Sequence, residues 1–111
     1  MITRYALFEG KVHEGKEAAF RAAVTAEILP HWKQFPGALS VRVSYAVKRD
    51  DGATEFPMIL AVSYPDLATC DAALASDVRP RARAATDGVM ARFFTGTIHH
   101  HWMDAEDYEE L

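Results

Sequence analysis

The segment Met58-Ile59-Leu60-Ala61-Val62-Ser63-Tyr64 is the most informative part of the chain, because it is apolar on both faces of the β-strand that it predicts. Its even-numbered side chains project from one face, and Ile59 and Ala61 project from the other. The chain's own helices can cover one face only. The other face needs cover from elsewhere, most simply from a second copy of the chain. Two sheets paired across a two-fold axis leave pockets between each sheet and its helices.

The rest of the chain predicts three more strands and two helices. Strands are predicted over residues 2–12, 39–48, 58–64 and 97–103, and the alternation of apolar and polar side chains is clearest over residues 39–48. Phe20, Val24 and Ile28 recur every four residues and predict a first helix, which restarts near Pro30. A second apolar stripe follows the third strand, with a break at Pro80. The order βαββαβ predicts an α+β, ferredoxin-like sandwich with a four-stranded antiparallel sheet and the helices on one face.

Length and charge limit the classes of function. The 111 residues suit one domain, expected over residues 1–103, followed by an acidic tail over residues 104–111. A formal net charge of −4 argues against a nucleic-acid partner, which would favour a basic patch. No stretch approaches the ~20 apolar residues of a membrane span, so no membrane partner is expected. Cys70 is the only cysteine and no signal sequence follows Met1, so a cytoplasmic location is expected.

Two short stretches carry a resemblance to a known family. Residues 12–20 (VHEGKEAAF) precede the first helix, and residues 36–38 (PGA) precede the second strand. Together with the order βαββαβ, they resemble the dimeric α+β barrel superfamily, and within it most closely the antibiotic biosynthesis monooxygenase-like proteins. The resemblance spans nearly the whole chain. Its motifs mark the start of a helix and the start of a strand, and they are not catalytic groups. It implies a homodimer formed through the open face of the sheet.

The resemblance also implies an activity. Cofactor-free monooxygenases of this type oxidise phenolic or polycyclic compounds, and the ionised substrate itself reduces oxygen. They use an Asn and a Trp in the cavity, and the haem-degrading members use an Asn, a Trp and a His. This sequence contains no asparagine. That departure argues against haem degradation and also separates the chain from the monooxygenase pattern.

The sharpest local pattern is the run of three histidines within residues 97–103. On a strand, His99 and His101 project together, whereas His100 shares the other face with Ile98 and Trp102. If Ile98 and Trp102 cover the helix side, His99 and His101 face the cavity. Each is then a candidate catalytic base, because imidazole titrates near neutral pH. One alternative is that His99 and His101 are partly exposed and hydrogen-bonded at a strand end or at the dimer interface. Another is a metal site, but such a site needs a third ligand, so no metal is predicted.

Five further side chains are candidates for substrate binding. Tyr5 and Tyr64 carry hydroxyls that can donate hydrogen bonds into a cavity. His31 and Trp32 follow the helix restart and are expected near the cavity mouth. Arg42, on the polar face of its strand, suits a substrate carboxylate. Each also has a structural interpretation, as a core aromatic residue, a plug at a helix end or a solvated sheet edge.

These patterns support three functional hypotheses. The leading one is a small-molecule enzyme that resembles cofactor-independent monooxygenases, binds no cofactor and acts on a compact aromatic or polyketide-like compound. The second is an isomerase, cyclase or lyase that works by proton transfer on the same fold. The third is a ligand-binding protein without catalysis. Oxygen consumption separates the first hypothesis from the second, and a cavity without catalytic side chains favours the third.

Overall fold

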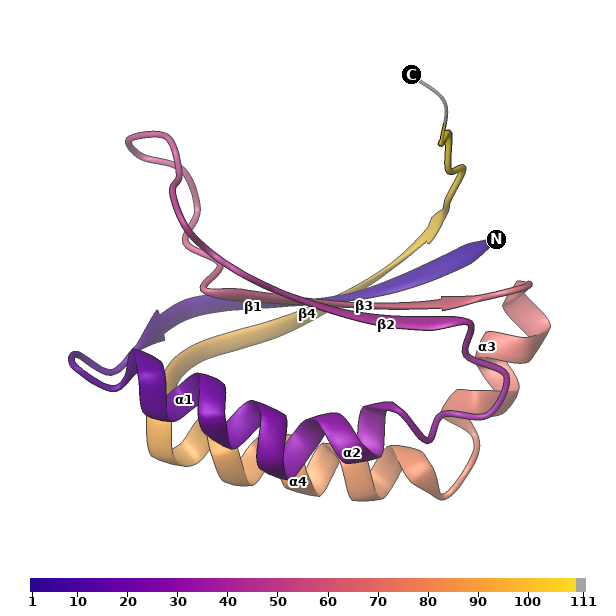
Figure 1. Ribbon diagram of the computed structural model, residues 1–111, viewed down its shortest axis with the longest axis horizontal. Helices are drawn as coiled ribbons and strands as arrows, with labels where there is room; N and C mark the ends of the chain where they lie inside the picture. The colour runs from indigo at the N-terminus through magenta and orange to yellow at the C-terminus, as the bar shows by residue number, and fades with distance from the viewer. Residues whose placement is uncertain (110–111) are drawn as a thin grey trace.

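A computed structural model describes residues 1–109 of the chain, and its elements follow the predicted order (Figure 1). The strands are β1 (Ile2–Val12), β2 (Ser40–Tyr45), β3 (Met58–Tyr64) and β4 (Phe94–Asp104). The helices are α1 (Glu17–Ala23), α2 (Leu29–Trp32), α3 (Leu67–Leu74) and α4 (Val78–Phe93), and a π-helical turn (Val24–Ile28) joins α1 to α2. The strands pair antiparallel in the order β2-β3-β1-β4. The predicted α+β, ferredoxin-like fold is therefore confirmed.

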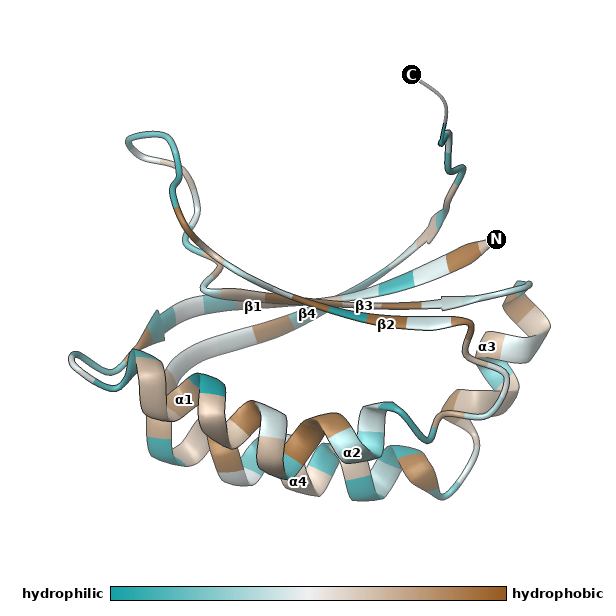
Figure 2. Ribbon diagram, in the orientation of Figure 1, coloured by the Kyte–Doolittle hydropathy of each residue, from teal (hydrophilic) through white to brown (hydrophobic). Residues whose placement is uncertain are grey.

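The helices all lie on one side of the sheet (Figure 1). Apolar side chains of the helices and strands meet between the two layers, and the most polar stretches lie in the long connections and at the C-terminal end (Figure 2). Phe8 of β1, Met58 of β3 and Phe20 of α1 are each at most 2% exposed. Cys70 of α3 is buried in the same core, as its place on the apolar stripe predicts. The opposite side of the sheet, called the open face below, has no helix over it in the single chain.

Both prolines within helices, Pro30 and Pro80, lie where the sequence predicts an interruption. Pro30 is in the first turn of α2, directly after the π-helical turn, and Pro80 is in the first turn of α4. At Pro80 the first-turn amide groups have no intrahelical acceptor, so a proline there removes no hydrogen bond. Pro30 instead follows the π-helical turn within a continuous helical run, where the local change of hydrogen-bonding pattern accompanies a residue without an amide hydrogen.

Two strand ends differ from the prediction by more than one residue. β2 stops at Tyr45 rather than near residue 48. Pro57, which lies opposite in the segment before β3, has no amide hydrogen to continue the ladder of hydrogen bonds. Val47, beyond the end of β2, is 98% exposed. β4 begins at Phe94 rather than at residue 97, because the backbone turns directly from helical to extended geometry at Phe94. Gly96 therefore lies inside β4.

Gly10 and Gly96 lie directly opposite each other in β1 and β4. A Cβ atom on Gly96 would collide with the carbonyl oxygen of Glu9, and one on Gly10 would collide with that of Thr95. The two strands approach closely here only because neither residue has a side chain. The contact shapes one wall of the cavity described below, which Gly96 lines.

Substitution Gly96→Ala is expected to lower the free energy of unfolding by about 1–3 kcal/mol, because the strands must separate to admit the methyl group. Urea denaturation of the purified protein measures this loss. Gly88→Ala is the matched control: Gly88 lies within α4 with nothing within 4 Å of an added Cβ. That change should stabilise the protein by about 0.5–1 kcal/mol, since alanine is the better helix former. Equal destabilisation by both substitutions would contradict the steric explanation.

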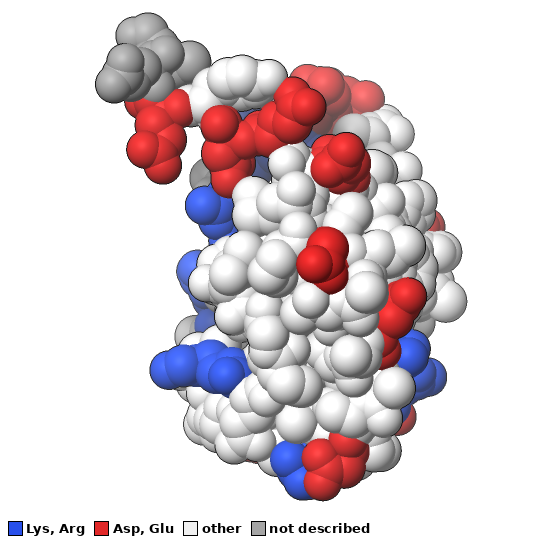
Figure 3. Space-filling view, turned by 90° about the vertical axis from the view of Figure 1, so that its right-hand side faces the viewer, with Lys and Arg blue, Asp and Glu red and all other residues white. Residues whose placement is uncertain are grey.

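The acidic C-terminal segment projects from the sheet on the side of the open face (Figure 1). Red carboxylate side chains gather at this end of the molecule in Figure 3. Within the described part of the chain, its one ion pair joins Asp104 to the N-terminal amine at 3.7 Å. The last two residues of the predicted acidic tail, 110–111, lie outside the described residues.

Candidate active site

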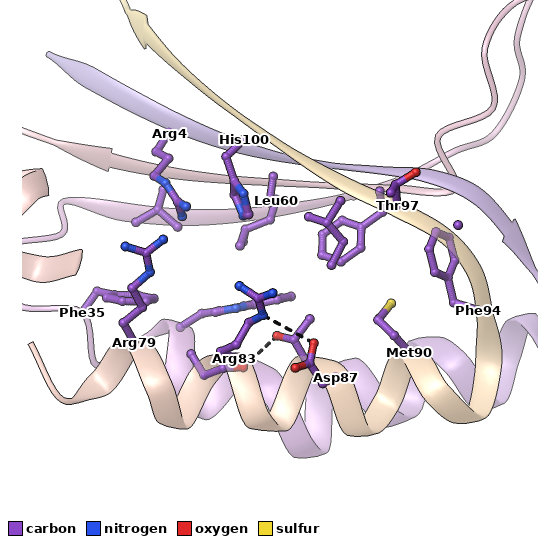
Figure 4. Close-up of a pocket in the computed structure, with 18 of the residues that line it drawn as sticks. Arg4, Phe35, Leu60, Arg79, Arg83, Asp87, Met90, Phe94, Thr97 and His100 are labelled. Atoms are coloured by element: carbon purple, nitrogen blue, oxygen red, sulfur yellow. Dashed lines mark hydrogen bonds and ion pairs between the residues drawn. The ribbon is translucent and has the colours of Figure 1, made fainter. Parts of the chain in front are cut away.

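A cavity of about 610 Å³ lies between the sheet and the helices α2 and α4 (Figure 4). Its volume is in the range of pockets that hold small organic molecules, about 300–1,000 Å³. Short side chains leave this room, since Ala6 of β1 and Ala82 and Thr86 of α4 are buried where larger residues would fill the gap. The cavity is therefore on the helix side of the sheet, where the pairing of sheets predicts pockets.

One end of the cavity is apolar. Met90 and Phe94 close it on the side of α4 and the start of β4 (Figure 4). Phe8, Leu60 and Ile98 extend this surface along the sheet, and Phe8 meets Phe94 edge to face at 6.3 Å between ring centroids. The packed rings give this end a rigid wall suited to an aromatic or alicyclic body.

The other end is positively charged. Arg4 of β1, Arg79 and Arg83 of α4, and His100 of β4 face one another across the cavity (Figure 4). Asp87 is the one carboxylate among the described lining residues, and it pairs with Arg83 at 3.5 Å from Nε to Oδ1. Three guanidinium groups against one carboxylate leave a surplus of two positive charges.

This environment sets the protonation of His100. Partial loss of hydration, followed by the positive charges of Arg4, Arg79 and Arg83, lowers the pKa of His100 to about 4. The imidazole is therefore neutral at physiological pH and has a nitrogen free to accept a proton. A developing anion beside it would be stabilised by the same arginines.

The lowered pKa of His100 predicts a pH-dependent loss of stability. Since the folded-state pKa lies near 4 and the unfolded value near 6.5, the unfolded chain binds more protons between these limits. The contribution of His100 to the free energy of unfolding should therefore fall as the pH drops below about 6.5 and level off below about 4. Urea denaturation over this pH range, compared with His100→Gln, measures the effect as the difference between the two curves. If the stability of both proteins changes with pH in parallel, the prediction is contradicted. NMR titration of the imidazole ring provides the pKa of His100 directly.

Two of the predicted substrate-binding residues line this cavity. Tyr64 of β3 is 1% exposed and Trp32 of α2 is 3% exposed, and both contribute to its wall. Burial raises the pKa of Tyr64 to about 12, with a further rise from Cys70 and an opposing effect of Arg4. The phenol of Tyr64 therefore stays protonated at neutral pH and is able to donate a hydrogen bond.

The other predicted site residues lie elsewhere. Tyr5 pairs across the ladder with Ala61 and His101, and Arg42 also pairs with Ala61, so all of them belong to the open face. His99 lies on that face too, where its Nε2 is 3.0 Å from Oε1 of Glu9. His31 lies next to Trp32 but does not line the cavity, and its Nδ1 is buried without a hydrogen-bond partner in the described chain.

The expectation that His99 and His101 face the cavity is therefore wrong for this cavity, where His100 takes the place. The alternation along the strand is as predicted, with His100 on the face of Ile98 and Trp102. The void lies on that face because α4 stands away from the sheet over short side chains. A catalytic role for His99 or His101 stays a prediction, and it requires a ligand on the open face.

Three arginines of the site were missed as binding residues by the sequence analysis. Arg79 and Arg83 are one helical turn apart, beside the buried stripe that contains Ala82 and Thr86. That spacing places both on one side of α4 but does not single them out from other exposed positions beside the stripe. Arg4 shares the core-facing side of β1 with Ala6, and its signal is a charge at an inward position.

Metal ligands are not clustered in the described chain. Within residues 1–109, no group of three or more His, Cys, Asp or Glu side chains is arranged to hold a metal ion. The pair His99 and Glu9 lacks a third such partner there.

Comparison with solved structures supports the fold. An ethyl tert-butyl ether D (EthD) family protein from Bacillus halodurans has a TM-score of 0.70 and 19% identity, over 96% of this chain and 99% of that one. A dimeric protein of unknown function with a ferredoxin-like fold, from Bacteroides fragilis, has a TM-score of 0.63 and 12% identity, over 94% and 95%. A point mutant of SnoaB, a cofactor-independent oxygenase from Streptomyces nogalater, has a TM-score of 0.60 and 16% identity, over 96% and 94%.

Proteins described as antibiotic biosynthesis monooxygenases are also among the similar structures. The resemblance stated from the sequence is confirmed at the level of the fold. No protein-family model matches the chain, and no curated protein matches it. Identities below 20% leave the activity to be argued from the cavity itself.

Proposed function

We propose that the protein is a small-molecule enzyme that binds a compact aromatic or polyketide-like compound in this cavity and removes a proton from it. One observation carries the proposal: the neutral imidazole of His100 faces a cavity that is apolar at one end and rich in arginine at the other. A base and groups that stabilise the developing anion are the requirements of proton abstraction.

The leading reaction is cofactor-free oxygenation. His100 takes a proton from an acidic phenol or activated methylene group, and the arginines stabilise the resulting anion. Such an electron-rich anion is able to reduce dioxygen directly. Where a methylene group becomes a ketone, one oxygen atom of dioxygen enters the product and the other leaves as water with the two hydrogens. The shared fold with a protein described as a cofactor-independent oxygenase supports this reaction.

Proton transfer without oxygen is the second candidate. The same imidazole and arginines suffice for an isomerase, cyclase or lyase, because all of these begin by removing a proton next to an activating group. A ligand-binding protein is the remaining alternative.

An oxygen-electrode assay separates the three. Purified protein is incubated with a panel of anthrone-like and naphthol-like compounds, in air and under nitrogen, and the products are analysed. Oxygen uptake that matches product formation supports oxygenation. Product formation under nitrogen supports the proton-transfer enzymes, and binding without turnover supports a ligand-binding protein.

We also propose that the working unit is a homodimer joined through the open face. Leu7, Ile59 and Ala61 place half-buried apolar side chains at the centre of this face. An apolar patch without cover is unfavourable in water, and a two-fold axis lets it cover itself. The similar ferredoxin-like protein described as dimeric is consistent with this arrangement.

The remaining predictions concern location and partners. No helix among the described residues has the length and apolar character needed to cross a membrane. A cytoplasmic location, and the absence of a nucleic-acid partner, stay predictions from the sequence.

A further inference from the structure

Arg4 and Arg79 form a pair of positive charges without a counterion. Neither guanidinium takes part in an ion pair within the described residues, whereas Arg49, Arg81, Arg83 and Arg92 all do. Arg4 and Arg79 come from opposite walls of the cavity, one from the sheet and one from α4 (Figure 4). Two like charges held together in this way raise the free energy of the empty site.

Arg4 is also unusually placed for an arginine. Its Nε atom is buried and has no hydrogen-bond partner in the described chain. Its guanidinium carbon lies 5.0 Å from the ring centroid of Trp102, so the aromatic face holds the group in one orientation. Burial and the neighbouring Arg79 lower the pKa of Arg4, which reflects the cost of this position. A guanidinium that lines a cavity and makes no ion pair within residues 1–109 is suited to a ligand acceptor.

We infer that the ligand of this cavity is an amphipathic organic acid, whose carboxylate lies between Arg4 and Arg79 and whose aromatic or alicyclic body fills the apolar end. The inference rests on the proposed function, because it names the ligand class of the same cavity. Planar guanidinium groups match the two oxygens of a carboxylate. The apolar wall of Phe8, Met90 and Phe94 requires a hydrophobic body and argues against inorganic phosphate or a sugar phosphate.

The acid group of the ligand would orient the ligand toward His100. Within the charged end, His100 lies beside Arg4 on the side that faces the apolar end (Figure 4). A carboxylate anchored on Arg4 and Arg79 therefore presents the adjoining part of the ligand to the imidazole. The anchored acid also cancels part of the positive field that keeps His100 unprotonated, so binding strengthens the base at the point where it is needed.

Paired probes test the inference without turnover. Full-length protein is titrated by calorimetry with benzoate, 2-naphthoate and 9-anthroate, and with the neutral amide of each. At least one acid is expected to bind about tenfold or more tightly than its amide, since charge-assisted hydrogen bonds are the stronger kind. Arg4→Gln and Arg79→Gln should each remove most of this preference. Arg79 is exposed on α4, so its variant tests the inference even if Arg4→Gln folds poorly.

Arg81→Gln is the matched control. Arg81 lies on the same helix and pairs with Asp77 at 3.2 Å, but it does not line the cavity. Its variant should keep the preference for the acid. NMR titration provides a second readout: the acid should raise the pKa of His100, and the amide should not.

Three results would overturn the inference. If acid and amide bind equally, the anion site is wrong while the proposed use of the cavity stands. If neither member of any pair binds, both the anion site and the proposed function fail. A preference that survives in both Arg4→Gln and Arg79→Gln would place the acid elsewhere.

Discussion

Replacement of His100 by glutamine is expected to lower kcat/KM by about 10²- to 10⁴-fold for a substrate found in the oxygen assay, the usual contribution of a positioned base. Glutamine keeps a polar side chain of similar length but cannot take up a proton. Since the pKa of His100 lies near 4, kcat/KM of the wild-type protein should also stay level from about pH 5 to 8 with respect to this group. Steady-state rates of the two proteins across this range measure both effects.

His99→Gln and His101→Gln are the matched controls, because each removes an imidazole from the same strand but from the open face. They should retain most of the activity. If either loses activity while His100→Gln keeps it, the base lies on the open face, as the sequence pattern alone predicted. Circular dichroism of all three variants excludes unfolding as the cause.

The histidine run shows what a sequence pattern resolves and what it does not. Strand alternation separates His100 from His99 and His101, because adjacent side chains point to opposite faces. It does not say on which face the empty space lies. That depends on how far α4 stands from the sheet, which is a property of the packed core; Ala6, Ala82 and Thr86 are the short side chains that line the space.

The arginines of α4 are a second case in which the sequence shows a pattern but not which residues meet in space. Their sequence marks α4 as basic, and the stripe of buried residues is visible in its period. Arg79 and Arg83 border this stripe, but so do other exposed positions. Only the rotation of α4 over the sheet determines which arginines meet Arg4, and this rotation is a property of the packed core.

The six-element order, by contrast, follows from local patterns. The bounds of β1 and β3 are those predicted, because β1 ends before the turn that contains Gly15 and β3 is an apolar run between Pro57 and Pro65. The errors lie at the ends of β2 and β4, where backbone pairing rather than side-chain alternation decides the boundary. Such ends depend on a partner strand that is distant in sequence.

Substitution Leu7→Arg is expected to convert the proposed dimer into a monomer at micromolar concentration. Leu7 lies at the centre of the open face, between Ile59 of β3 and His99 of β4. A two-fold axis places two copies of the new charge in one interface, where each loses hydration without a carboxylate to pair with. Such unpaired buried charges cost about 3–5 kcal/mol, which corresponds to a dissociation constant raised by more than about 10²-fold. Light scattering after size exclusion, and sedimentation velocity, measure the mass.

Leu67→Arg makes the same chemical change on the outside of the helical layer, where Leu67 begins α3 and is 49% exposed. It should leave the mass of the assembly unchanged, so it separates a loss of the interface from a general effect of added charge. A Leu7→Arg protein that remains dimeric would show that the subunits meet through another surface. A wild-type protein that is already monomeric would show that the open face is stable in water on its own. In either case the cavity on the helix side stays intact, because the residues that line it belong to a single chain. The test of assembly is therefore independent of the test of His100.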